Sequence, residues 1–195
     1  MKAHADGIDT LRKFKNVYFA AIGNNDLTSV CFPYKFNYSE ADSRHLLNFL
    51  AKDSFFIKND RQKHNFFPST LTGKNASLAN LNLVLDTIAR KATKDDAFIL
   101  YNNGIAGKIK GNNLAMENLP DFNFKTGNAA DPNVYNAMIL TGGGPGSQLT
   151  TGWLKNKLDL IPCGHILLII DANNADKIAY ELMNDIADKT PCSIT

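Results

Sequence analysis

Residues 165–174 read H-I-L-L-I-I-D-A-N-N, and this segment decides the fold class. Branched apolar residues follow one another without alternation from Ile166 to Ile170. A run of this kind is typical of a strand that is buried on both faces, in the middle of a parallel sheet. In open α/β sheets, ligands bind beyond the carboxyl ends of the strands. We therefore expect the functional site of this chain at residues 171–174.

The rest of the chain alternates apolar runs with amphipathic segments. Pro68 places one of the predicted strands at an edge of the sheet, because proline cannot donate to a strand ladder. Strands alternating with helices predict an α/β fold with three α/β/α layers and a mostly parallel central sheet. The expected strands cover residues 17–22, 66–71, 97–101, 137–140 and 165–170, and the expected helices cover 39–50, 77–92, 150–158 and 175–186.

Length and composition predict a single soluble domain over residues 1–195, in which 44% of the residues are hydrophobic. We expect residues 1–15 to be a polar lead-in and residues 108–135 to be an irregular insertion. The net charge of +2 does not favour nucleic acid or a membrane surface as a partner. Three scattered cysteines, without a signal segment, favour a reducing, cytoplasmic location.

Four segments together resemble the large-subunit portion of caspase-like cysteine peptidases, the group of caspases, metacaspases and bacterial caspase homologues. They are the apolar run at 17–23, the helix at 39–50, the stretch at 71–101 that ends in D-D-A-F-I-L-Y, and the strand and turn at 165–176. The resemblance implies the caspase-hemoglobinase fold and, in active members, a cysteine endopeptidase with a histidine and cysteine dyad.

Both catalytic motifs of that family are altered in this chain. The family's histidine lies in a Y-x-S-G-H-G turn, but residues 101–107 read Y-N-N-G-I-A-G and place Ile105 at the histidine position. The family's cysteine lies in D-A-C, but Asp171 and Ala172 are followed by Asn173. Isoleucine cannot transfer a proton, and an amide is a very poor nucleophile. We therefore expect no catalytic residue at this site and no proteolysis from it.

The sequence thus predicts a pseudo-peptidase domain that binds a protein or peptide and acts as a regulatory module, without a cofactor or metal. Its partner is expected to be an extended peptide, an active caspase-like homologue or a second copy of the chain. The family's last strands are not evident after Pro191, which predicts a truncated domain, a cleaved large subunit, or a domain completed by a partner. The residues expected to line the cleft are Asn24, Asn103, Gly104, Asp171, Asn173 and Asn174.

Two alternative functions remain open from the sequence. An active hydrolase would need other residues, such as Cys31, or a group supplied by a partner. Cys163 and His165 lie before a strand, at the end of the sheet opposite the expected cleft, so we expect them to be structural. A small-ligand-binding domain would use the glycine-rich segment 142–146, which matches no phosphate-binding motif.

Overall fold

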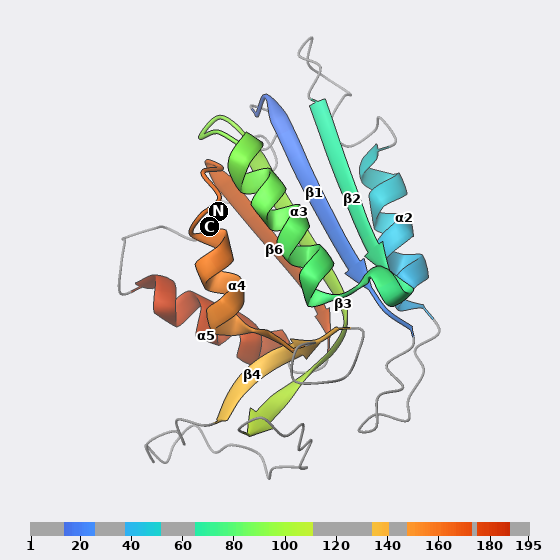
Figure 1. Cartoon of the computed structure of the whole chain (residues 1–195), viewed down its shortest axis with the longest axis vertical. Helices are drawn as coiled ribbons and strands as arrows, with labels where there is room; N and C mark the ends of the chain where they lie inside the picture. The colour runs from blue at the N-terminus through green and yellow to red at the C-terminus, as the bar shows by residue number, and fades with distance from the viewer. Residues whose placement is uncertain are drawn as a thin grey trace, which may run out of the picture.

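A central sheet with four parallel strands organises the molecule. The computed structural model describes residues 14–25, 38–51, 65–110, 134–140, 148–172 and 175–187. The parallel strands lie in the order β2 (Asn65–Thr72), β1 (Asn16–Gly23), β3 (Ala97–Lys110) and β6 (His165–Ala172). The second half of β3 continues into an antiparallel extension with β4 (Val134–Ile139) and β5 (Gln148–Thr150) (Figure 1).

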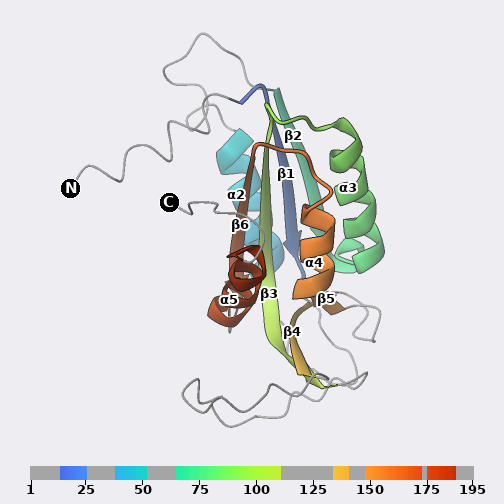
Figure 2. The same cartoon turned by 90° about the vertical axis from the view of Figure 1, so that its left-hand side faces the viewer.

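Helices cover both faces of this sheet, which gives the three-layer α/β/α architecture expected from the sequence (Figure 2). Helix α2 (Ser39–Ala51) packs against β1, β2 and β3 on one face, whereas α3 (Leu78–Lys91) and α4 (Thr151–Leu158) lie on the other. A short 3-10 turn, η1 (Gly73–Asn75), leads into α3. The last helix, α5 (Ala175–Ala187), packs against α4, β4 and β6. None of the described helices is both long enough and apolar enough to cross a lipid bilayer.

Helix α3 forms where its sequence pattern predicts it. The Ser77 side chain accepts a hydrogen bond from the Asn80 amide at 3.3 Å and so caps the first turn. Leu81, Leu85 and Ile88, spaced three to four residues apart, are all buried. Thr150 caps α4 in the same way, by accepting from the amide of Trp153 at 3.1 Å.

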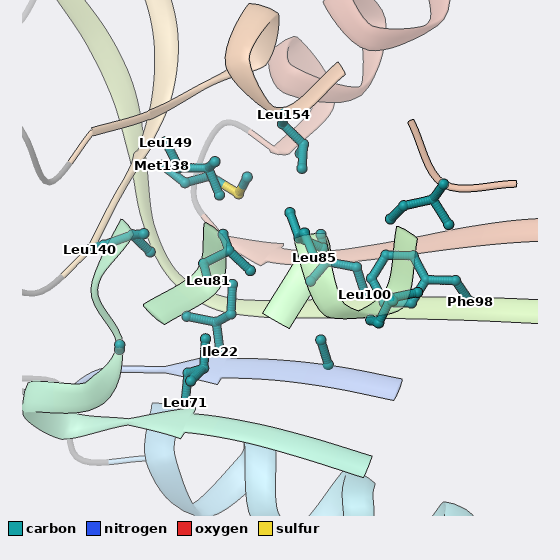
Figure 3. Close-up of a cluster of buried hydrophobic side chains, with 14 of the residues drawn as sticks. Ile22, Leu71, Leu81, Leu85, Phe98, Leu100, Met138, Leu140, Leu149 and Leu154 are labelled. Carbon is teal, nitrogen blue, oxygen red and sulfur yellow. The ribbon is translucent and has the colours of Figure 1, made fainter. Parts of the chain in front are cut away.

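The hydrophobic core is divided by the sheet into two clusters. The larger cluster lies between the sheet and α3, α4 and α5, and Figure 3 shows its side chains. The smaller lies on the α2 side of the sheet and includes Val17, Phe19, Ile99 and Tyr101. Each fully buried large apolar side chain stabilises the fold by about 1.5–3 kcal/mol. The labelled members of the larger cluster are Ile22, Leu71, Leu81, Leu85, Phe98, Leu100, Met138, Leu140, Leu149 and Leu154.

The amino ends of the strands are joined by the carboxylate of Asp96, which is fully buried. One oxygen accepts from the backbone and side-chain nitrogens of Asn16, at 3.1 and 2.7 Å. The other accepts from the backbone nitrogen and hydroxyl of Thr93, at 2.8 and 3.1 Å. The Asp96 carbonyl accepts from the Gly164 amide at 3.0 Å. The Asp96 side chain therefore positions the starts of β1 and β3, and the Asp96 carbonyl group contacts Gly164, the residue before β6.

The prediction that the segment 165–170 is a strand buried in the middle of the sheet is wrong for the residues that the structure describes. Among these residues β6 pairs only with β3 and forms an edge. Ile166 and Leu167 are 37% and 42% exposed, whereas β1 is buried from Val17 onward. A continuous apolar run predicts burial only if strands flank it on both sides, and β6 has one neighbour in this part of the structure. By contrast, Pro68 lies on β2, which is an edge strand among the same residues, as expected.

The prediction that the strand at 97–101 ends in a turn at 102–107 is also wrong. Strand β3 continues through these residues to Lys110, because β4 pairs with residues 105–110 and provides hydrogen-bonding partners for their backbone. The glycines in this segment suggested a turn, and the pairing with a distant strand overrides that local preference. The predicted insertion 108–135 overlaps both strands, and its residues 111–133 lie outside the described part of the chain.

Candidate functional site

The candidate site lies where the parallel strands β1 and β6 end, beside the middle of β3 at Asn103 and Gly104. The parallel register places Gly23 beside Asn103 and Asn103 beside Asp171. It also places Gly104 beside Ala172. Residues far apart in the sequence are thereby brought to one edge of the sheet, as expected for ligand sites in open α/β folds.

The side-chain amide of Asn103 connects three elements at this edge. Its nitrogen lies within donating distance of Asp42 Oδ2 on α2 at 3.2 Å, of the Tyr101 hydroxyl at 3.0 Å, and of Asp171 Oδ2 on β6 at 3.3 Å. An amide nitrogen has only two hydrogens, so these three acceptors share two donors. The Tyr101 hydroxyl donates to the same Asp171 oxygen at 3.2 Å. Both bonds to Asp171 therefore end on Oδ2, and Oδ1 has no hydrogen-bond partner among the described residues.

Tyr101 acts here as a neutral hydrogen-bond donor. Burial raises the pKa of its hydroxyl above the ordinary value, and the nearby charges of Asp171 and Asp42 raise it further, although the hydrogen bond from Asn103 lowers it in part. A phenol with a raised pKa is not a base near neutral pH. The hydroxyl positions the Asp171 carboxylate, which is itself exposed.

The amino end of α2 forms the wall of the site next to β1. The Asn25 side-chain oxygen accepts from the Glu40 amide at 3.1 Å, and the Asn25 amide donates to Glu40 Oε1 at 3.4 Å. This reciprocal pair begins the helix, as a capping box does. Ser39 is the first helical residue of α2. A Cβ atom at Gly23 would overlap the Ser39 carbonyl, so this close approach requires glycine.

The structure brings together three of the predicted cleft residues, namely Asn103, Gly104 and Asp171. Asn24 is only 4% exposed, so it is not presented to a ligand. Asn173 and Asn174 lie outside the described residues. The sequence did not indicate Asp42 or Tyr101 as members of the site. Asp42 reaches the site because α2 packs against β3, and Tyr101 lies on β3 two residues before Asn103, whose amide it contacts.

The described residues that touch this site provide acids, amides and a phenol, but no thiol or imidazole. The other end of the sheet carries both groups. Burial first, and then the charge of Asp96, raises the pKa of the Cys163 thiol to about 11. The ring of His165 packs edge-on against Phe14 at 4.8 Å between centroids. Both residues lie at the amino end of β6, as predicted, and the raised pKa is that of a structural thiol.

The remaining candidates can be placed only in part. Among the described residues there is no group of three or more His, Cys, Asp or Glu side chains arranged to hold a metal ion. His45 is exposed on α2, as expected. Cys31 and the glycine-rich segment 142–146 lie outside the described residues.

The chain was compared with known proteins. No family model matches the sequence, and no curated protein matches it. The structure resembles the crystal structure of protein GSU0716 from Geobacter sulfurreducens, with a TM-score of 0.57 and 17% sequence identity. The match covers 92% of this chain and 67% of the other chain. At this identity the likeness shows a shared fold.

Proposed function

We propose that this chain is a caspase-like domain without a catalytic dyad, which binds an extended protein or peptide segment in a regulatory role. One observation carries the proposal. The register of β3 and β6 pairs Gly104 with Ala172, and these residues directly precede Ile105 and Asn173. The positions that correspond to the histidine and cysteine of the resembled family thus directly follow two paired residues of adjacent strands. Ile105 and Asn173 occupy these positions in place of the two reactive groups.

Peptide binding is supported by the free bonding capacity at this edge. Asp171 is exposed and has one carboxylate oxygen without a described partner, so it can accept a hydrogen bond from a peptide N–H group. Three acceptors compete for the two hydrogens of the Asn103 amide. A ligand carbonyl can therefore replace one of these acceptors at a small cost in free energy. Recognition of an extended peptide depends on such bonds and not on a nucleophile.

The first experiment is incubation of the chain with a diverse peptide pool, with and without calcium, followed by mass spectrometry. We expect no reproducible cleavage. Cleavage that persists in Asn173→Ala would show that the protein is a hydrolase using other residues, such as Cys31. A thiol-reactive peptide probe would then identify the cysteine by stoichiometric labelling.

The second experiment tests binding itself, with a peptide array probed by the labelled protein. We expect Asp171→Ala to weaken the binding of the retained peptides by roughly ten- to a hundredfold, since hydrogen bonds to charged groups contribute about 1.5–3 kcal/mol. The matched control is Asp159→Ala, because Asp159 is an exposed aspartate at the end of α4, away from the site. Equal loss in both variants would indicate a general charge effect and would contradict the assignment of this site.

A further inference from the structure

An apolar groove lies between α3 and the outer edge of the sheet, remote from the candidate site. It has a volume of about 420 Å³ and is lined by residues of β1, β2 and α3, including Tyr18, Phe66, Phe67, Leu83, Val84 and Lys91. This volume falls in the range of about 300–1,000 Å³ that is typical of small-molecule sites. The groove opens at the edge strand that carries Pro68.

Aromatic side chains form one wall of the groove. The rings of Tyr18 and Phe67 stack with centroids 5.2 Å apart and an angle of 20° between their planes. Phe67 remains 48% exposed, and Leu83, on the α3 side, is 63% exposed. Single exposed apolar side chains are common, but two of them lining one groove present a surface that a flat apolar body would cover.

Among the described residues that line the groove, only Lys91, in the last turn of α3, is charged. Its ammonium group forms no ion pair or hydrogen bond with another described residue. Lys91 also lies near the helix carboxyl end, where a positive charge is favoured by the helix dipole. That stabilising role alone would not require an aromatic surface beside the charge.

From this combination we propose that the groove binds a small amphipathic anion, with a flat apolar body on Phe67 and Leu83 and one acidic group at Lys91. The occupant follows from complementarity, since an apolar body covers the aromatic wall and an anion pairs with the free ammonium group. A neutral apolar ligand would leave Lys91 without a partner, and a polyanion would find only one cation among the described lining residues. The inference is independent of the proposed peptide site, because no residue is shared between them.

The test uses two fluorescent probes with nearly the same aromatic body. Anilinonaphthalene sulfonate carries one negative charge, and phenylnaphthylamine carries none. We expect saturable binding of the charged probe at one equivalent, with higher affinity than for the neutral probe. Lys91→Gln should weaken binding of the charged probe by roughly three- to fivefold, as an exposed ion pair does, and leave the neutral probe unchanged.

Two further variants make the test specific. Leu83→Glu should weaken both probes, and its large exposure makes loss of folding a small risk. Lys94→Gln is the matched control, because Lys94 is an exposed lysine three residues further along that does not line the groove. The proposal is overturned if binding does not saturate, if both probes bind equally, or if Lys94→Gln weakens binding as much as Lys91→Gln.

Discussion

The two ends of the parallel sheet use the same types of polar residue in opposite ways. At the amino end, the buried Asp96 carboxylate accepts four hydrogen bonds from Asn16 and Thr93. At the carboxyl end, the Asp171 carboxylate is exposed and accepts two, both on one oxygen. One acid has its bonding capacity filled by the fold, and the other keeps capacity for something outside it.

This difference separates structural polar groups from those available for binding. A buried acid is tolerated only when its hydrogen bonds are complete, so Asp96 must be matched by partners that the fold holds in place. An exposed acid has no such requirement, because water satisfies it until a ligand arrives. Among the described residues at the carboxyl end, capacity for binding is found at β3 and β6 only. The end of β1 is closely packed against α2 at Gly23, which leaves no room there for a ligand.

The largest expected effect is that of Asp96→Ala. The substitution removes a fully buried carboxylate together with its four hydrogen bonds to Asn16 and Thr93, and we expect it to lower the free energy of unfolding by about 3 kcal/mol. Urea denaturation measures the loss. The neighbouring Asp95 is exposed, so Asp95→Ala serves as the control and should change stability little. A loss below about 1 kcal/mol for Asp96→Ala would remove the contrast between the two ends.

The reactivity of Cys163 should show a comparably large effect. Burial, with the charge of Asp96, raises the pKa of this thiol from its ordinary value of 9.0 to about 11, so its thiolate fraction near neutral pH falls about a hundredfold. We expect alkylation of Cys163 in the folded protein to be slower by about that factor than in urea. Mass spectrometry of the peptide that contains Cys163 measures it separately from the other cysteines. Rapid labelling of the folded chain would show that the amino end of β6 is open.

A pair of glycine substitutions compares the packing at the two ends. A Cβ at Gly164 would meet the Lys94 carbonyl, and backbone atoms cannot move aside, so Gly164→Ala should cost about 2 kcal/mol. A Cβ at Gly104 meets no atom within 4 Å, so Gly104→Ala should change stability by less than about 0.5 kcal/mol. Thermal or urea unfolding of both variants gives the difference. Equal effects would show that the carboxyl end is packed as closely as the amino end.

Local sequence signals were sufficient for much of this fold. Pro68 predicted an edge strand, Ser77 and one of the threonines at 150 and 151 predicted helix starts, and the spacing of Leu81, Leu85 and Ile88 predicted a buried face. These predictions succeeded because each depends on bonds or contacts within a few residues, where the backbone geometry is set by the residue type.

Predictions that depend on distant partners failed or were never made. The extension of β3 to Lys110 depends on pairing with β4, which lies beyond a long intervening segment. The exposure of Ile166 depends on which strands flank β6. Asp95 and Asp96 look alike in the sequence, and only the fold distinguishes the buried one. In the site, Asp42 reaches Asn103 through the placement of α2, which no local pattern encodes.

The smallest expected effect concerns the open end itself. Burial raises the pKa of Tyr101, and the Asp171 charge adds to this, so Asp171→Asn should lower that pKa part of the way toward its ordinary value. Absorbance titration, with Tyr101→Phe as the reference, isolates this hydroxyl from the other tyrosines. Because the folded pKa lies above the unfolded value of about 10, the contribution of Tyr101 to stability is present below that pH and is lost as the pH rises through the folded pKa.

The free energy of unfolding of Asp171→Asn near neutral pH should differ from that of the unchanged chain by less than about 0.5 kcal/mol. Asp171 is exposed and only one of its carboxylate oxygens accepts hydrogen bonds from the described residues, so it contributes little to stability. If Asp171→Asn instead destabilised the chain as strongly as Asp96→Ala, both acids would be structural, and the carboxyl end would have no capacity left for a ligand.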